Sequence, residues 1–424
     1  MLTRILHNNK VLCTFIRQLD LKLSVPQLRH VTNVVDGLLV TTAPKTLAEI
    51  WRQFVVCVDP SNIADTFRIG PWTAQDIRRP LGRMLMQIGL ERLRCRQEPL
   101  CILINIDDSL AIKDPDTRHL QGVDFHYYHP HRRKKRNRIQ NGLAYLICNI
   151  VVGSWNFTFA VRPYLRRETV HRINRRRPGQ RRLRFVSKYR IARQILEECH
   201  QLIPKGVAVY VQFDAWYASA RLLKYIRRQG WHATCQIQSN RTLDGVRLSQ
   251  HDLAQRHQRY VHVDIPATDG STRTYLVRHM QGRLRNVPFP VRVLVTRRHL
   301  RDQHPVYFIS TDLSLSPHTA LQWYARRWNC ETDNWYLKQR LGFGDFRLQS
   351  YEAIDKFCTV VHLALAYLQW RLIQQPEHRL QNPADVIRLH AHEHACDWLR
   401  GACQEAIASG DVEAVLQRFL PHPP

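Results

Sequence analysis

The sequence predicts an α/β protein, with α+β character in parts: a mixed sheet flanked by helices, a β-rich insertion, and helical regions at both ends. Three observations predict this class. Residues 99–240 alternate short apolar runs with segments of helical spacing, residues 241–312 keep the two-residue period of strands, and both ends of the chain have apolar residues at helical spacing.

The N-terminal region, residues 1–98, is expected to be mainly helical. Its clearest signal is an amphipathic face formed by Ile77, Leu81, Met84, Leu85 and Ile88. Spacing alone assigns no helix-turn-helix in this region.

The first part of the predicted core begins with three strands. Residues 101–106 form a short apolar run that ends in Asp107 and Asp108. Two β-rich runs follow at residues 139–152 and 155–162, and the Gly-Ser pair between them predicts a tight turn rather than a membrane span. Three consecutive strands indicate an antiparallel meander.

Helices and strands then alternate up to residue 240. Apolar residues at helical spacing predict a helix over 187–203, and a β-rich run over 207–213 ends in Asp214. A second helix and a further strand are expected at 215–228 and 231–237.

Residues 241–312 are expected to form a β-rich insertion. A turn signal stands at Asp269-Gly270. Strands are predicted near residues 259–264, 273–280, 289–297 and 306–311.

A long capped helix is predicted within residues 313–345. Ser316 is a good N-cap, Pro317 suits the first helical position, and Gly342 suits the left-handed residue that ends a helix. About seven turns are implied at 3.6 residues each. Residues 346–424 also have helical spacing and are expected to pack against the core or to form a dimer contact.

Four polar side chains share one stripe of this long helix. The spacing Y-x2-R-x3-E-x6-K places Tyr324, Arg327, Glu331 and Lys338 within roughly 60° of one another at about 100° per residue. Charged side chains are almost never fully buried without partners, so the stripe should face water or a ligand. The alternative is an ordinary i,i+4 pair between Arg327 and Glu331 on a solvated face.

The composition favours nucleic acid as a partner. The 424 residues include 63 Lys and Arg against 35 Asp and Glu, a formal charge of +28, and such an excess attracts phosphate polymers through counterion release. Eleven cysteines without a C-x2-C pair indicate reduced thiols in the cytoplasm rather than disulfides or structural zinc. With 44% hydrophobic residues the chain can bury a large core, and no membrane partner is expected.

Three acidic positions share a pattern. Asp107 or Asp108, and Asp214, end predicted strands, and Glu331 lies on a helix that can pack beside the same sheet. Convergent carboxylates bind hard divalent cations, and two such ions can clamp the attacking and leaving oxygens of an in-line displacement. A single aspartate at a strand end is more often a cap or turn residue, but the set of three together with the stripe favours a metal site.

These features resemble the DDE transposases of bacterial insertion sequences, whose RNase H-like core has the same order of elements and which carry a Tyr-Arg-Glu-Lys signature. The resemblance covers roughly residues 100–345. It rests on ILINIDDSLAIK at the first acid, VYVQFDAWYASARLL at the second and LQWYARRWNCETDNWYLKQRLGFGDF around the third.

The resemblance implies an RNase H-like sheet and two Mg2+ ions, with Mn2+ as a substitute. The implied catalytic residues and metal ligands are Asp107, Asp214 and Glu331, with Asp108 as the alternative to Asp107. The implied phosphate-binding residues are Tyr324, Arg327 and Lys338. The implied reaction is cleavage of DNA at the ends of the element and strand transfer into target DNA by a cut-and-paste route, with a hairpin intermediate common among related members.

The implied partners are the terminal inverted repeats, target DNA and a second copy of the chain in a synaptic complex. Residues 1–98 are the best place for recognition of the DNA ends, and binding to DNA would associate the protein with the nucleoid. Basic clusters at residues 131–138 and 172–184 lie in predicted loops that can follow a DNA backbone. The DNA-binding candidates of the first cluster are Arg132, Arg133, Lys134, Lys135 and Arg136.

Two alternatives remain open at this point. An RNase H-like nuclease or resolvase would use the same acids without joining strands, and a domesticated DNA-binding protein would have lost catalysis. Related transposases stack a base near the transposon end on an aromatic side chain, which makes Trp328 and Trp335 candidates, but a packing role in the interior is favoured for both.

The histidine clusters lack the spacing of zinc sites. His126, His129 and His131 have no second ligand pair, and neither have His390, His392, His394 and Cys396. Surface or loop histidines are expected.

Overall fold

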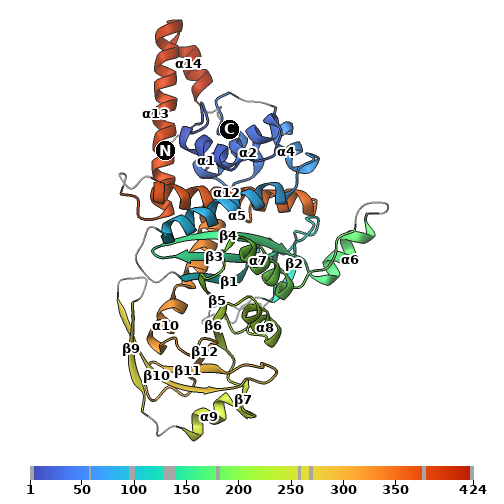
Figure 1. Ribbon diagram of the computed structural model, residues 1–424. Helices are drawn as coiled ribbons and strands as arrows, with labels where there is room; N and C mark the ends of the chain where they lie inside the picture. The colour runs from blue at the N-terminus through green and yellow to red at the C-terminus, as the bar shows by residue number, and fades with distance from the viewer. Residues whose placement is uncertain are drawn as a thin grey trace.

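The computed structural model describes residues 4–56, 59–94, 101–127, 139–177, 182–255, 259–266, 271–374 and 379–420. Figure 1 shows a central sheet with the helices from both ends of the chain gathered beyond one end of it and the strands of residues 241–312 at the other. The fold class predicted from the sequence, a mixed α/β sheet with helical ends, is confirmed.

The central sheet contains ten strands among the described residues and runs in the order β2-β3-β1-β5-β6-β12-β11-β10-β9, with β4 also paired to β3. β1 pairs antiparallel with β3 and parallel with β5, and β5 pairs parallel with β6. The strands are β1 (Cys101–Ile112), β2 (Asp124–Tyr127), β3 (Ile139–Val152), β4 (Trp155–Tyr164), β5 (Ala208–Phe213), β6 (His232–Ile237), β9 (Val261–Pro266), β10 (Thr272–Gly282), β11 (Val291–Arg297) and β12 (Val306–Ser310).

The strands predicted for the insertion are present and extend the central sheet, because β12 pairs antiparallel with β6. Two further elements in this region were not predicted: a small hairpin of β7 (Thr242–Leu243) and β8 (Val246–Arg247), and the helix α9 (Leu248–Ala254). The predicted turn at Asp269-Gly270 lies outside the described residues.

The terminal helices form a layer that packs on β4. α12 is buried along most of its length because α2, α5 and β4 surround it, and Figure 1 shows α5 and α12 lying across the sheet. The helices of this layer are α1 (Lys10–Gln18), α2 (Val25–Val40), α3 (Leu47–Trp51), α4 (Pro60–Arg68), α5 (Ala74–Arg94), α12 (Tyr351–Gln374), α13 (Pro383–Ser409) and α14 (Val412–Phe419). In the described part of the chain, no helix has the length and hydrophobicity needed to cross a membrane.

The remaining helices cover the core strands. α7 contacts β3 and β4, α8 contacts β6, and α11 contacts β1, β3 and β4. They are α6 (Arg167–Arg175), α7 (Lys188–Leu202), α8 (Ala220–Arg228), α10 (Pro317–Ala325), α11 (Trp328–Trp335) and the π-helical segment η1 (Tyr336–Arg340).

Two predicted element boundaries near the acids are wrong. β1 does not end at Ile106 but continues to Ile112, because its second half keeps pairing with β3 after β5 has ended. The helix predicted from residue 215 begins only at Ala220, because Asp214 accepts hydrogen bonds from the next amides and turns the chain first.

The single long helix predicted over residues 317–342 is also wrong. Its ends are as predicted, since Ser316 caps the N-terminus and Gly342 has a φ of +64°. Between them the helix breaks: the amides of Arg326 and Arg327 bond to carbonyls three residues back instead of four, and a π-helical turn follows. An ideal-helix stripe therefore does not describe how the four signature residues come together.

Candidate active site

The two strands that carry acids meet in parallel register. Ile106 of β1 pairs with Phe213 of β5, so the residues that follow them, Asp107 and Asp214, lie at the same level of the sheet. Because β5 ends at Phe213 while β1 continues, the edge of β1 next to Asp107 is open on that side. This opening is where the candidate site lies.

Asp107 is 8% exposed and binds Arg327. One guanidinium nitrogen of Arg327 donates to Oδ2 of Asp107 at 2.5 Å. Burial raises the pKa of Asp107 to about 7, with the Arg327 charge opposing the rise and the carboxylates of Glu331 and Asp214 adding to it. A buried acid among other acids favours either a proton or a cation beside it.

Asp108 faces the other side of the sheet, as strand alternation requires. Its carboxylate accepts a hydrogen bond from Nζ of Lys188 at 2.5 Å and one from the hydroxyl of Tyr217 at 3.0 Å. Asp107 and Asp108 therefore have separate surroundings, and only Asp107 contacts the signature residues.

Asp214 lies in the turn after β5. Its Oδ1 accepts hydrogen bonds from the amides of Trp216 and Tyr217 at 3.0 and 3.3 Å. Burial, and next the charge of Asp108, raise the pKa of this carboxyl. The second carboxylate oxygen of Asp214 is not used in these turn contacts.

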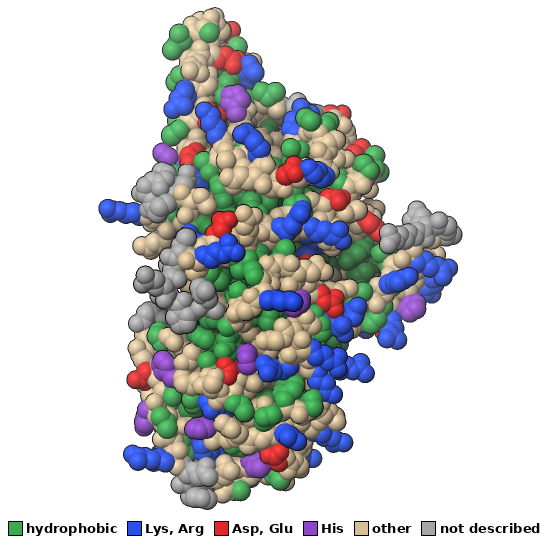
Figure 2. Space-filling model, viewed as in Figure 1, with side chains coloured by type: hydrophobic (Ala, Val, Ile, Leu, Met, Phe, Trp, Pro, Cys, Tyr) green, Lys and Arg blue, Asp and Glu red, His purple; other side chains and the backbone are tan. Residues whose placement is uncertain are grey.

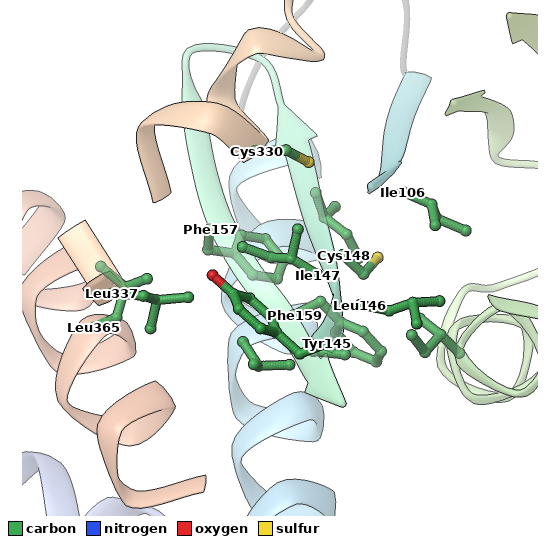
Figure 3. Close-up of a cluster of buried hydrophobic side chains, with 14 of the residues drawn as sticks. Ile106, Tyr145, Leu146, Ile147, Cys148, Phe157, Phe159, Cys330, Leu337 and Leu365 are labelled. Carbon is green, nitrogen blue, oxygen red and sulfur yellow. The ribbon is translucent and has the colours of Figure 1, made fainter. Parts of the chain in front are cut away.

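Glu331 lies on α11 and has a side chain that is 43% exposed. Its Oε1 is 3.9 Å from the guanidinium of Arg327, so this arginine lies between the third acid and the first. Figure 3 shows Cys330 and Leu337, on the same helical segment, among the buried apolar side chains, and both are fully buried. These anchors hold Glu331 at the surface beside the sheet.

A polar network fixes the same helix from below. Asp333 is buried and accepts hydrogen bonds from Asn149 at 2.7 Å, Thr158 at 2.7 Å and Gln369 at 3.0 Å. Burial raises the pKa of Asp333 to about 6, and the three hydrogen bonds oppose that rise. α11 is thus tied to β3, β4 and α12 two residues after Glu331.

The other signature side chains also point at the acid-bearing strands. The Tyr324 hydroxyl donates to the carbonyl of Phe213 at 3.4 Å, next to Asp214. Lys338 donates to the hydroxyl of Ser109 at 3.0 Å, on the strand face of Asp107. The broken helix therefore brings together what the sequence predicted for an unbroken one.

The three acids are close but not in one cage. The carboxylate oxygens of Asp107, Asp214 and Glu331 do not all lie within 4.8 Å of one another, the spacing at which three side chains could hold one metal ion. The guanidinium of Arg327 is the group between two of them.

Only part of the predicted DNA-binding loops lies within the described residues. Residues 128–138 lie outside the described residues, and with them Arg132, Arg133, Lys134, Lys135 and Arg136. In the second cluster, Arg172 and Arg175 are exposed on α6. Figure 2 shows Lys and Arg side chains gathered over the α6 and α8 side of this face.

Two predictions about aromatic and histidine residues are wrong. Trp328 and Trp335, expected in the interior, are 51% and 45% exposed. His390 and His394, expected on the surface or in loops, are buried in α13. His126 is half-buried, and its neighbours in that predicted cluster, at 129 and 131, lie outside the described residues.

Sequence reasoning missed the partners that surround the acids. Lys188 and Tyr217 gave no signal beyond their place next to a helix cap and an acid, and Asp333 resembled an ordinary exposed helix residue. A cavity of about 920 Å3 lies between α5, β4 and α7, and its lining does not include Asp107, Asp214 or Glu331. The site is an open, charged surface rather than that cavity, as suits a polymer substrate.

β1, β5 and β6 are parallel, β3 runs antiparallel to β1, and Asp107 and Asp214 follow paired residues of β1 and β5. This strand order is that of an RNase H-like core. Residues 186–368 match the family model described as "Transposase DDE domain". We therefore identify this segment as a transposase DDE domain, and the predicted resemblance to DDE transposases is confirmed. The matched segment includes Asp214 and Glu331 but begins after Asp107. No curated protein matches the chain.

A transposase-type enzyme function follows from this domain, with DNA as the partner class. Transposase DDE domains generally use divalent metal ions.

Proposed function

We propose that this protein is a transposase that cuts DNA at the ends of an insertion sequence and transfers the cut strand into target DNA. The observation that carries the proposal is the convergence of Asp107, Asp214 and Glu331 on one open strand edge, with Arg327 between the first and third acid.

The acids fit a hard divalent cation. The donor set is made of carboxylate oxygens, which Mg2+ and Mn2+ prefer, and a site with few protein ligands leaves room for water and phosphate. Burial raises the pKa of Asp107 and of Asp214, with neighbouring carboxylates adding to each rise, and a bound cation would stabilise the charged forms. We propose Asp107, Asp214 and Glu331 as the ligands of two Mg2+ ions.

Asp107 is the first acid in this proposal, and Asp108 has a supporting role. Asp107 lies on the same strand face as Ser109 and binds Arg327. Asp108 lies on the other face, where Lys188 and Tyr217 bind it. Both acids have a cationic partner, so the assignment rests on which strand face lies toward Arg327 and Lys338.

Held by these acids, the ions would polarise a water molecule and stabilise charge on the attacking and leaving oxygens. The chain does the positioning. Arg327 must leave Asp107 for that carboxylate to bind a cation, and the freed guanidinium can then form bidentate hydrogen bonds with a phosphate. Lys338 contacts Ser109 and Tyr324 contacts the carbonyl of Phe213, so both lie beside the acid-bearing strands and can hold neighbouring phosphates.

The chemical balance is simple. A water oxygen bonds to phosphorus as the bond to the 3′ oxygen breaks, which leaves a 5′ phosphate and a 3′ hydroxyl. In strand transfer this hydroxyl oxygen bonds to a phosphorus of target DNA as the bond from that phosphorus to its own 3′ oxygen breaks, which joins the strands and leaves a new 3′ hydroxyl in the target. We propose the cut-and-paste route, the terminal inverted repeats as the first DNA partner, a homodimer in the synaptic complex, and a cytoplasmic, nucleoid-associated location.

Cleavage of labelled DNA that carries the inverted repeats flanking the gene tests this proposal. Wild-type protein should cut in Mg2+ and not in EDTA, and Glu331→Ala should cut at least roughly a hundredfold more slowly, since losing a metal ligand costs several kcal/mol. Thr332→Ala, an exposed neighbour on α11, is the matched control and should cut like wild type. Equal cutting by Glu331→Ala and wild type would refute the proposal.

A further inference from the structure

A buried group of one aspartate and two histidines lies far from the candidate active site. Asp36 of α2 and His390 and His394 of α13 are 0%, 0% and 2% exposed. In the part of the chain that the structure describes, they are the one group of three possible metal-ligating residues whose ligand atoms all lie within 4.8 Å of one another. None of them takes part in the proposed reaction.

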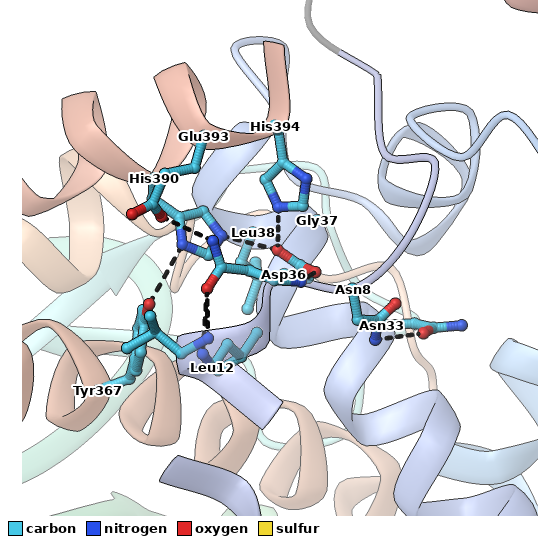
Figure 4. A network of polar contacts seen from close by, with 12 residues as sticks. Asn8, Leu12, Asn33, Asp36, Gly37, Leu38, Tyr367, His390, Glu393 and His394 are labelled. Carbon is cyan, nitrogen blue, oxygen red and sulfur yellow. Dashed lines mark hydrogen bonds and ion pairs between the residues drawn. The ribbon is translucent and has the colours of Figure 1, made fainter. Parts of the chain in front are cut away.

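The two histidines point at one oxygen atom. Their Nε2 atoms are each 2.7 Å from Oδ1 of Asp36, and Figure 4 shows both rings directed from α13 at this carboxylate. One turn of helix separates His390 from His394, which places both rings on the same face. The neighbouring His392 and Cys396 lie on the outer face and are exposed.

The surroundings hold these ligand atoms in place. The second oxygen of Asp36 accepts a hydrogen bond from the amide of Asn9 at 3.0 Å, and Nδ1 of His390 is 3.3 Å from the hydroxyl of Tyr367. Outer hydrogen bonds of this kind fix the ring orientation of metal-binding histidines. The donors converge before any ion is bound.

Among the described side chains, the ion-pair partners of Asp36 are the two histidines. Among the described residues no Lys or Arg pairs with it, and the nearby Arg371 is engaged by Glu393. A fully buried carboxylate needs a counter-charge, which here comes either from a proton on a histidine or from a cation.

We propose that Asp36, His390 and His394 bind a zinc-class divalent ion that ties α13 to α2. Two imidazole nitrogens and one carboxylate oxygen are a donor set that zinc accepts, with a water molecule as the fourth ligand. With metal–ligand bonds of about 2.0 Å, tetrahedral ligand atoms lie roughly 3.3 Å apart, so the present 2.7 Å contacts need to open by about 0.6 Å.

The site is structural rather than catalytic. The order His390, two residues, Glu393, His394 matches an H-x-x-E-H helix pattern of zinc peptidases. However, both ligand histidines are buried, and Glu393 bonds to Asn9 and Arg371 instead of facing the ligand group. The ion would join two segments separated by 354 residues in the chain.

Cobalt binding to the untagged wild-type protein is the first test, because it needs no variant. After chelation and dialysis, Co2+ should give a visible absorption band typical of tetrahedral nitrogen and oxygen ligands, saturating at one ion per chain, and Zn2+ should abolish it. A titration without such a band would overturn the proposal. If the three residues only bond to one another by hydrogen bonds and bind no metal, no such band is expected.

Variants then locate the ion. Protein purified without added metal should carry one zinc per chain by plasma mass spectrometry, and so should His392→Asn, the matched control on the same helix. His390→Asn and His394→Asn should lose most of this zinc, while Glu331→Ala should keep it, which separates this site from the active site. Equal zinc in wild type and His390→Asn would overturn the proposal without bearing on the transposase function.

Discussion

The ion pair between Arg327 and Asp107 predicts a stability effect that metal should reverse. Arg327→Met keeps the apolar part of the side chain and removes the charge, which leaves the buried Asp107 carboxylate without its ion-pair partner. The side chains of Arg327 and Asp107 are only 16% and 11% exposed, so removing one partner should cost about 3 kcal/mol, the lower end of the range for buried pairs.

Magnesium should restore much of that loss in the variant. Binding at a hundred times the dissociation constant stabilises a folded protein by about 2.7 kcal/mol. Arg327→Met should gain nearly this amount, because no guanidinium competes for Asp107, whereas wild-type protein should gain less. The difference between the two proteins should therefore be large in EDTA and small in MgCl2.

Urea unfolding followed by tryptophan fluorescence, in EDTA and in MgCl2, measures this effect. The matched control is Arg326→Met, because Arg326 is exposed and donates to the carbonyl of Gly153 at 2.6 Å, a contact that contributes about 1 kcal/mol. Equal losses for the two variants in EDTA, or equal stabilisation of Arg327→Met and wild type by magnesium, would refute the reasoning.

Three further predictions follow from single contacts. Asp107→Asn should slow DNA cleavage roughly a thousandfold and Asp108→Asn by no more than about tenfold, and the reverse order in a single-turnover assay would assign the first acid to Asp108. Burial lowers the pKa of His362 to about 3 against about 6.5 when unfolded, so wild type should lose stability relative to His362→Gln as the pH falls from about 7 to about 4, by at most about 1.4 kcal/mol per pH unit; parallel urea midpoints across that range would contradict it. Gln212 is buried, and neither polar atom of its amide has a partner among the described residues, so Gln212→Met should raise the free energy of unfolding by about 1 kcal/mol, and a lower urea midpoint would show that the amide has a bound partner.

Local signals in the sequence predicted most of the fold. β-rich runs located the core strands, and Ser316 marked a helix start that the structure confirms as an N-cap. These signals work because capping and strand alternation depend on residues near in sequence. They also located the acids, since Asp214 directly follows a strand.

Contacts between distant segments were beyond those signals. Lys188 binds Asp108 from 80 residues away, and Asp333 is held by Asn149 and Thr158 across more than a hundred residues of chain. The helix break at Arg326 has no glycine or proline to announce it. It is stabilised by what surrounds it, including the bond from Arg326 to Gly153 on the hairpin.

The buried histidines show a signal that was present but misjudged. The spacing of two residues across His390, His392 and His394 argued against a zinc pair. In a helix, however, residues four apart lie on the same face, and His390 and His394 are four apart. The third member, Asp36, lies at the opposite end of the chain, and only the packing of α13 on α2 brings it to them.

The length difference between β1 and β5 explains why the candidate site lies where it does. Because β5 stops at Phe213, Asp107 loses its neighbour on one side, and the break in the long helix places Arg327 in that opening. A guanidinium can satisfy a buried carboxylate in the absence of a cation, but it cannot bind that carboxylate and a phosphate fully at the same time. Under the proposed function, metal binding to Asp107 and phosphate binding to Arg327 should therefore favour each other, so that the site is completed only when DNA and metal are both present.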